Sequence, residues 1–182
     1  MIVFENVTKA YDETVLDNVT LNFEGGKITA LLGASGRGKT TVLRLLSGLE
    51  KADSGKVKAD GKVGYLFQEH RLLPSLTAIE NVRLVTDSDE VANHALELCA
   101  ATTLADKRPD EMSGGERQRA ALARLVAFGG DIWLMDEPFS ALDADTKETV
   151  VKNLVPLMRK KTVVLVTHSE SEATIADNII RL

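Results

Sequence analysis

The chain of 182 residues has a single cysteine, Cys99, and no long run of apolar residues. A lone cysteine cannot form an intrachain disulfide, and such sparse cysteine use is typical of a reducing compartment. No segment approaches the roughly 18 consecutive apolar residues that a membrane-spanning helix needs, and residues 1–5 lack the regions of a signal peptide. We therefore expect a cytoplasmic protein, for which any role at a membrane requires a separate partner.

An excess of positive charge is also missing, because the formal net charge is −5. This balance argues against a protein that binds nucleic acid by neutralising phosphates, so no nucleic-acid partner is expected. The sequence shows no internal repeat, low-complexity tract or long linker. Its length suits one α/β domain that buries roughly 70% of the surface of the unfolded chain.

Short apolar segments predict strands, and two of the later ones are almost entirely apolar, as expected for parallel strands covered on both faces. The predicted strands are residues 3–7, 20–23, 28–32, 63–67, 132–135, 163–167 and 179–182. Residues 51–61 are polar and predict turns. Apolar residues at helical spacing over 76–85 and 89–99 predict a helical insertion. A further helix is predicted after it, over residues 114–128.

Residues 33–40 form a complete phosphate-binding loop. They read Gly33-Ala34-Ser35-Gly36-Arg37-Gly38-Lys39-Thr40 and match the spacing G-x-x-x-x-G-K-[ST]. In this pattern backbone N–H groups surround a polyphosphate, the lysine reaches its outer phosphates and the hydroxyl holds Mg²⁺. A predicted strand precedes the loop and a predicted helix follows it, so the helix N-terminus points at the phosphates. A chance glycine turn would lack these flanks, and we predict that the chain binds a nucleoside triphosphate.

Two acids, Asp136 and Glu137, end the apolar segment 132–135. In α/β sheets ligands bind at the carboxyl ends of the strands. Asp136 is placed to hold Mg²⁺ beside Thr40, and Glu137 is the candidate to orient and deprotonate an attacking water. Solvated acids at a strand end are common, so this pattern alone also permits a purely structural interpretation.

The sequence Ser113-Gly114-Gly115-Glu116 begins the helix predicted over 114–128. Ser113 can accept a hydrogen bond from the N3 amide while Glu116 returns one, and this capping box is a sufficient local explanation. The two glycines after the cap also leave N–H groups at the helix N-terminus open to an anion. The residues taken alone fit both interpretations.

Together these motifs resemble those of the ATP-binding cassette (ABC) family. Residues 112–116 look like the L-S-G-G-Q signature of that family, and the other landmarks follow in the family's order over essentially the whole chain. By this resemblance Tyr11 stacks on adenine, Gln68 is the Q-loop glutamine and His168 contacts the γ-phosphate. Taken singly, Tyr11 could merely cover a hydrophobic edge, and His168 could be an ordinary histidine at a strand end.

The resemblance implies that many of the quoted residues contact nucleotide. They are the phosphate loop, the threonine after it, the signature and the aspartate of the D-loop: Gly33, Ala34, Ser35, Gly36, Arg37, Gly38, Lys39, Thr40, Thr41, Ser113, Gly114, Gly115, Glu116 and Asp143. Glu137, His168 and Gln68 are then catalytic, and Thr40, Gln68 and Asp136 hold the metal. The implied cofactors are ATP and Mg²⁺, and the implied partner is a second copy, whose signature closes over the triphosphate.

The implied fold is α/β, a P-loop NTPase core with a mainly parallel sheet, an N-terminal antiparallel β-subdomain and an inserted helical subdomain. Residues 1–182 would form a single nucleotide-binding domain, with the helical subdomain at about residues 69–112. The signature departs from the family pattern, because Met112 replaces leucine and Glu116 replaces glutamine. The added negative charge of Glu116 is expected to lower nucleotide affinity across the dimer. The stretch from Lys39 to Gln68 is short for the family, which predicts a trimmed β-subdomain.

Transport is the preferred function among the uses of such ATPases. DNA-maintenance ATPases of the family are split by long coiled coils, ribosome-associated ones resemble two cassettes in one chain, and small P-loop kinases do not require both the signature and His168. Residues 66–82 are similar to importers of nitrate, sulfonates and taurine, although lipoprotein-type exporters carry a related Leu-Leu-Pro segment.

We therefore predict an importer ATPase at the inner face of the cell membrane, bound to permease subunits and served by a solute-binding protein. An exporter ATPase, or a non-transport ABC ATPase that acts on DNA or ribosomes, is the alternative.

Overall fold

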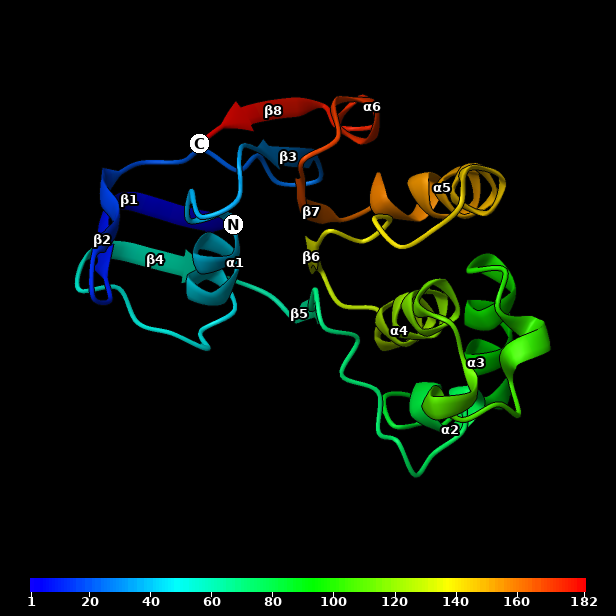
Figure 1. Cartoon of the computed structure of the whole chain (residues 1–182). Coiled ribbons are helices and arrows are strands. Elements are labelled where there is room, and N and C mark those ends of the chain that lie inside the picture. The colour runs from blue at the N-terminus through cyan, green and yellow to red at the C-terminus, as the bar shows by residue number, and fades with distance from the viewer. The chain divides into compact units, whose positions relative to one another are not determined.

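The computed structural model describes residues 1–182, which divide into two compact units. The sheet unit comprises Met1–Tyr65, Gly130–Glu137 and Met158–Leu182, and the helical unit comprises Leu66–Gly129 and Pro138–Leu157. The chain enters the helical unit twice, so neither unit is one continuous segment (Figure 1).

The N-terminal part of the sheet unit is an antiparallel sheet of three strands. Their order is β2 (Thr14–Val19), β1 (Ile2–Ala10) and β4 (Ser54–Ala59). The prediction of turns over residues 51–61 is wrong for the six residues that form β4. The strand escaped prediction because it lies at the sheet edge and none of its residues is buried, so its sequence SGKVKA carries little apolar signal.

The prediction of a strand at residues 20–23 is wrong, because the second strand, β2, ends at Val19. Leu21 and Phe23 are nevertheless buried, and the Leu21 amide donates to the Phe4 carbonyl at 2.9 Å. The alternating apolar residues, Leu21 and Phe23, are therefore buried in a segment that lies against the sheet but does not continue β2.

A second sheet of five strands forms the rest of the sheet unit. Its order is β5 (Val63–Leu66), β6 (Ile132–Asp136), β7 (Thr162–Thr167), β3 (Ile28–Leu32) and β8 (Asn178–Arg181). β6 pairs in parallel with β7, and β3 pairs in parallel with both β7 and β8. Every residue of β3 and β6 is buried, which explains their continuous apolar sequences. Parallel pairing brings the carboxyl ends of these strands to one edge, where ligands bind in α/β sheets.

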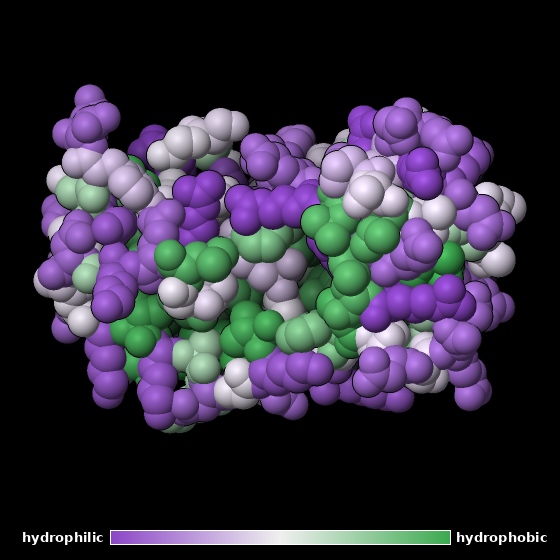
Figure 2. Space-filling view, turned by 90° about the horizontal axis from the view of Figure 1, so that it is seen from below, coloured by the Kyte–Doolittle hydropathy of each residue, from purple (hydrophilic) through white to green (hydrophobic).

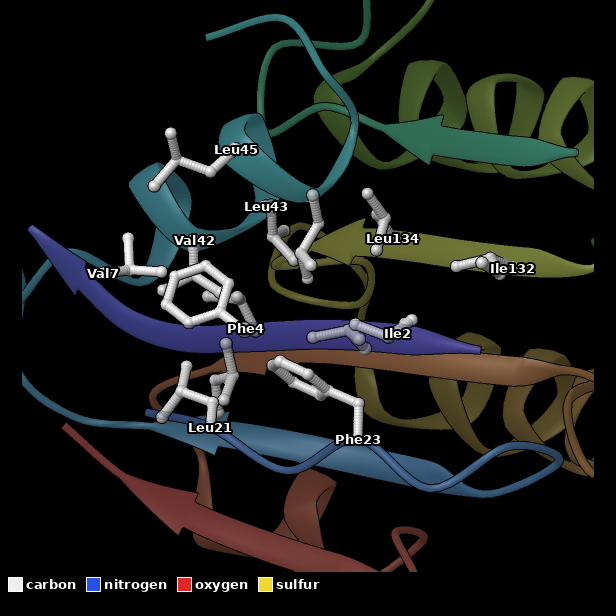
Figure 3. Packing of buried hydrophobic residues seen from close by; sticks show 14 of the residues in the cluster. Ile2, Phe4, Val7, Leu21, Phe23, Val42, Leu43, Leu45, Ile132 and Leu134 are labelled. Carbon is white, nitrogen blue, oxygen red and sulfur yellow. The ribbon is translucent and has the colours of Figure 1, made fainter. Parts of the chain in front are cut away.

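The core of the sheet unit joins both sheets to helix α1 (Lys39–Leu46). In Figure 3, Leu43 of α1 points toward Leu134 of β6, and Phe4 of β1 lies among the same group of side chains. The rings of Phe4 and Phe23 meet edge to face with centroids 6.4 Å apart. This packing fixes the junction of β3 and α1. A short helix, α6 (Glu170–Ala173), follows β7.

The helical unit is built around α4, which packs against α2 and α3. Its elements are α2 (Ala78–Arg83), α3 (Asp89–Leu98), the 3₁₀ turns η1 (Thr102–Leu104) and η2 (Pro109–Glu111), α4 (Gly114–Phe128) and α5 (Ala144–Met158). α4 ends at Gly129, whose φ of 70° suits glycine. α5 was not predicted from the sequence, because it begins with a polar turn and contains Pro156.

Every helix falls short of the combined length and apolar content that crossing a membrane requires. On the face shown in Figure 2, hydrophilic side chains surround smaller areas of apolar ones.

Replacing Phe4 with alanine should lower the free energy of unfolding by about 3–5 kcal/mol, because the ring is 1% exposed and its removal leaves a cavity between the sheets and α1. Urea unfolding monitored by circular dichroism measures the change. Leu49→Ala, at a residue that is 57% exposed, is the control and should change stability by less than about 0.5 kcal/mol. Equal unfolding midpoints for the two variants would contradict the packing described here.

Candidate functional site

The phosphate-binding loop connects β3 to α1 within the sheet unit. Gly36 and Gly38 have φ values of 82° and 83°, in the left-handed region that glycine adopts without strain. A Cβ at Gly38 would also lie 2.8 Å from Leu16 Cδ2, so a side chain there would displace Leu16. The last two residues of the loop, Lys39 and Thr40, are the first two of α1, and the N-terminal amides of this helix provide a site for an anion.

Lys39 places a positive charge at this loop. Its Nζ donates to the carbonyl oxygens of Gly33 and Ala34, both at 2.7 Å, and the residue is only 7% exposed. The ammonium group is therefore held by the loop backbone, where it can meet the charge of a bound phosphate.

The Thr40 hydroxyl lies beside the Asp136 carboxylate and favours its charged form. Asp136 ends β6 and is 2% exposed. Burial raises the pKa of Asp136 and the neighbouring charge of Glu137 raises it further, whereas the Thr40 hydroxyl opposes the rise. A buried carboxylate whose charge is disfavoured gains from a nearby cation. The paired hydroxyl and carboxylate oxygens are donors that fit Mg²⁺.

Glu137 and His168 lie together at the carboxyl ends of β6 and β7. Glu137 Oε1 is 3.5 Å from His168 Nδ1. The φ of Glu137 is 49°, a strained value for a residue other than glycine, and Pro138 follows it. The Glu137 amide donates to the Val166 carbonyl at 3.0 Å, which stabilises this conformation. Backbone strain of this kind clusters at functional sites.

A buried acid, Glu172, supports the segment around His168. The Thr167 hydroxyl donates to Glu172 Oε2 at 2.6 Å, and the Ser169 amide donates to the Thr167 hydroxyl at 3.0 Å. Glu172 is 7% exposed. The residues on both sides of the histidine are therefore fixed. An open pocket of about 360 Å³ adjoins them, and it is lined by Leu32, Gly33, Ala34, His168, Glu170, Arg181 and Leu182.

Tyr11 is tied to α1 through its hydroxyl. The hydroxyl donates to Glu50, which also pairs with Arg44 Nη1 at 3.2 Å, and Thr41 lies near it. Burial and, after it, the Glu50 carboxylate raise the pKa of Tyr11. The residue is still 51% exposed, and an exposed ring held beside α1 suits stacking with a nucleobase.

In the helical unit, Ser113 and Glu116 form the capping box of α4. Ser113 Oγ accepts from the Glu116 amide at 3.2 Å, and Glu116 Oε2 accepts from the Ser113 amide at 2.7 Å. Lys107 Nζ donates to the other carboxylate oxygen at 2.9 Å. The Ser113 amide and then Lys107 lower the pKa of Glu116 to about 2.

The D-loop segment, residues 140–143, packs on the first turn of α4. A Cβ at Gly115 would lie 2.8 Å from the Ala141 carbonyl oxygen, so only glycine allows this approach. The buried Gln118 Nε2 donates to the Pro138 carbonyl at 2.8 Å. The structure thus brings together two segments that the sequence analysis singled out, the signature and the D-loop.

Gln68 and Asp143 have no demonstrated contact with the other predicted residues. Gln68 is exposed and follows β5 after one intervening residue. Asp143 Oδ1 accepts from the Thr146 amide at 3.0 Å in the first turn of α5, and this bond lowers the pKa of Asp143. Asp143 therefore has a complete local role, and the nucleotide contacts of both residues stay predictions.

The loop between β5 and α2 is fixed by Asn81, which is fully buried. Asn81 Oδ1 accepts from the Leu73 amide at 2.7 Å, and its Nδ2 donates to the carbonyls of Leu73, Leu76 and Thr77 at 3.0–3.1 Å. Arg124 donates to two further carbonyls of the loop, at 2.9 and 3.1 Å. The segment that resembles importers therefore has a defined conformation.

A strand, β3, leads through the glycine-rich loop into the lysine-bearing helix α1, and a buried acid ends β6 of the same sheet. This arrangement defines a P-loop nucleotide-binding protein. The pattern of the family described as ABC transporter matches residues 16–140, which is more than half of the chain. The chain belongs to the ABC transporter family.

Similar proteins agree with this assignment. The chain is 40% identical to a sulfate/thiosulfate import ATP-binding protein of Chromobacterium violaceum, over 98% of this chain and 58% of that protein. It is 44% identical to an aliphatic sulfonates import ATP-binding protein of Delftia acidovorans, over 94% of this chain and 75% of that protein. A dimeric ATP-binding cassette solved in a post-hydrolysis state with ADP and Pi is 34% identical, with a TM-score of 0.92, over 100% of this chain and 94% of that one.

The chain spans little more than half the length of the sulfate/thiosulfate relative and most of the other two proteins. The comparisons confirm the predicted family, the α/β fold with its P-loop NTPase core, and the prediction of an ATP-binding ABC ATPase. The boundaries of the inserted helical subdomain and the roles of the individual site residues stay predictions.

Three supporting side chains were not predicted. Glu50 and Lys107 contact site residues only because of the fold, and no sequence pattern indicates those pairings. Glu172 could have been found, because Ser169 is the N-cap of α6 and the two residues have the spacing of a capping box.

The contribution of Glu116 to the stability of the fold should be lost in acid. Its folded pKa of about 2 lies below the ordinary 4.5, so the unfolded chain takes up the proton first as the pH falls. The contribution is fully present above about pH 4.5 and is lost as the pH falls toward 2. Urea unfolding of the wild type and of Glu116→Gln should therefore differ most near neutral pH, and the difference should shrink below about pH 4. Glu148→Gln, at an exposed glutamate of α5, is the matched control. A difference that grows in acid would contradict this account.

Proposed function

We propose that this chain is the ATP-hydrolysing subunit of an ABC importer and acts as a dimer. The observation that carries the proposal is the cluster of chemical groups in the sheet unit. Lys39 lies at the phosphate loop, Thr40 lies beside a buried Asp136, and Glu137 lies 3.5 Å from His168. A phosphate cradle, a cation site and an acid beside a histidine are the parts that phosphoryl transfer to water requires.

The residues of the loop bind and orient ATP in this proposal. The amides of the loop, from Gly33 to Thr40, and the ammonium of Lys39 hold the phosphates, while Thr41 lies in the first turn of α1 and Tyr11 supports the adenine. Thr40 and Asp136, with Gln68, would hold Mg²⁺, which when bound neutralises charge on the phosphates. The buried position of Asp136 excludes water from one side of this site.

Glu137 is the proposed general base. Its backbone is held at a strained φ at the end of β6, so the carboxylate has a fixed position for accepting a proton from the attacking water. His168, anchored on both sides by Thr167 and Ser169, would contact the γ-phosphate and keep the carboxylate oriented. Positioning of this kind supplies most of the acceleration in phosphoryl transfer.

The signature and Asp143 of a second copy complete each site in this proposal. Ser113, Gly114, Gly115 and Glu116 would meet the γ-phosphate that the loop of the first copy binds. A similar cassette was solved as a dimer with ADP and Pi, which supports this arrangement. Hydrolysis would then depend on association, because neither copy has a whole site.

Import is favoured over export by the names of the relatives, which include sulfate/thiosulfate and aliphatic sulfonates import proteins. We propose that the chain lies at the cytoplasmic face of the membrane on permease subunits, and that the cargo is a small anion with a sulfur oxyanion group, delivered by a solute-binding protein. The loop fixed by Asn81 and Arg124 is the proposed contact with the permease, because its backbone is ordered before any partner binds.

Replacing Glu137 with glutamine should abolish ATP turnover while ATP binding persists, since the amide cannot accept the proton but leaves the phosphate loop intact. We expect turnover to fall by at least about 100-fold, and an ATP-bound dimer to accumulate on size-exclusion chromatography. Lys39→Ala is the matched comparison and should lose ATP affinity instead. Turnover near the wild-type rate in Glu137→Gln would show that another group is the base.

A membrane partner should co-purify with the chain when it is expressed at native level in its own host. Import would be supported by a polytopic permease that stays bound to the chain in detergent. In liposomes, this permease should stimulate ATP turnover when its solute is present on the outer side. Stimulation by DNA or ribosomes without a membrane partner would favour the non-transport alternatives. The doubly substituted variant Asn81→Leu/Arg124→Met, which releases the loop, should reduce recovery of the permease but keep ATP binding.

A further inference from the structure

Glu116 is the residue that adds a charge to the signature, and Lys107 lies directly against it. Lys107 Nζ is 2.9 Å from Glu116 Oε1, and the two side chains are 43% and 22% exposed. The other carboxylate oxygen accepts the Ser113 amide at 2.7 Å. One oxygen is therefore bound by the backbone of the cap and the other by a cation.

The backbone around Lys107 is itself fixed. The Lys107 amide donates to the Leu104 carbonyl, and its carbonyl accepts from the Ala78 amide, both at 2.9 Å. The next amide of α2, that of Ile79, donates to the Ala105 carbonyl at 3.0 Å. The segment before the signature is thus bound to the N-terminus of α2, and the lysine side chain extends from a defined point to reach Glu116.

A second capping box in the same unit provides a comparison. At the start of α2, Glu80 Oε2 accepts from the Thr77 amide at 2.8 Å, as Glu116 does from Ser113. A capping glutamate therefore needs no lysine at 2.9 Å in order to cap. The ion pair at Glu116 calls for an explanation beyond helix capping.

We propose that Lys107 is a positioning residue of the signature, which holds the Glu116 carboxylate against the Ser113 amide and neutralises it. An acid at this position can then lie close to a triphosphate held by a second copy. The inference rests on the proposed function, because the charge of Glu116 matters to the nucleotide only if the signature meets one. It also revises the expectation that Glu116 weakens the dimer, since the charge is compensated within the same chain.

A double-mutant cycle of Lys107→Met and Glu116→Gln tests the proposal, with all variants also carrying Glu137→Gln so that ATP-bound dimers accumulate. Lys107→Met should raise the ATP concentration at half-maximal dimer formation about two- to fivefold in low salt, the range expected for an exposed ion pair. The effect should diminish near 1 M salt, where the Debye length is about 3 Å. In the Glu116→Gln background the lysine substitution should have no further effect, and Lys107→Arg should behave as the parent.

Two further measurements separate this proposal from the proposed function. Lys152→Met, at an exposed lysine of α5, controls for the loss of one positive charge and should match the parent. Carboxyl NMR of Glu116 in nucleotide-free protein needs no dimer, and Lys107→Met should raise the titration midpoint toward its ordinary value. An unchanged midpoint, or a double variant that dimerises less well than Glu116→Gln alone, would overturn the role of Lys107. If the parent fails to dimerise with ATP, the proposed function fails, and the NMR midpoint still decides whether Lys107 positions Glu116.

Discussion

The approach of the Thr40 hydroxyl to the Asp136 carboxylate is the contact on which the site depends. It joins the first turn of α1 to the end of β6, two segments far apart in the sequence. They meet because a parallel sheet presents the carboxyl ends of its strands at one edge and because α1 packs on the same core as β6. Burial disfavours a charged carboxylate in that position, and the adjacent Thr40 hydroxyl favours it. The same contact leaves a hydroxyl and a carboxylate side by side, where a divalent cation finds both.

Three acids of the chain have polar groups of their own unit beside them. Asp136 lies beside Thr40, Glu172 accepts from Thr167, and Glu116 is held by an amide and a lysine. Each acid would repel a polyphosphate, and a neighbouring polar group offsets that charge locally. Glu137 differs, because its conformation is strained and its carboxylate faces a histidine. That difference is what favours Glu137 as the proton acceptor.

The sequence predicted the parts of the fold that have a strong local signal. The fully apolar strands β3 and β6, the glycine-rich loop and the capped helix α4 each depend on residues close together in the chain, and the structure has all of them. β4 escaped because its residues are polar and pairing at a sheet edge stabilises it. α5 escaped because it begins with a polar turn and contains Pro156, although Val150, Leu154 and Met158 at helical spacing are buried. Contacts such as Lys107 with Glu116 could not be predicted, since only the tertiary fold brings a side chain from one turn to the cap of another helix.

The two glycines of the signature distinguish a helix N-terminus that is only capped from one that can also bind an anion. The cap of α2 has the same reciprocal bonds as the cap of α4, but Ala78 and Ile79 follow it and are buried. At α4 the corresponding residues are Gly114 and Gly115. Gly115 has a packing reason, because a Cβ would collide with the Ala141 carbonyl, whereas a Cβ at Gly114 would meet no atom within 4 Å. Nothing in the folded chain itself requires glycine at 114, and glycine is a poorer helix former than alanine. A residue that costs stability without serving the fold is best explained by an external group that must approach the backbone, and the amides at this helix tip would present such a group with donors.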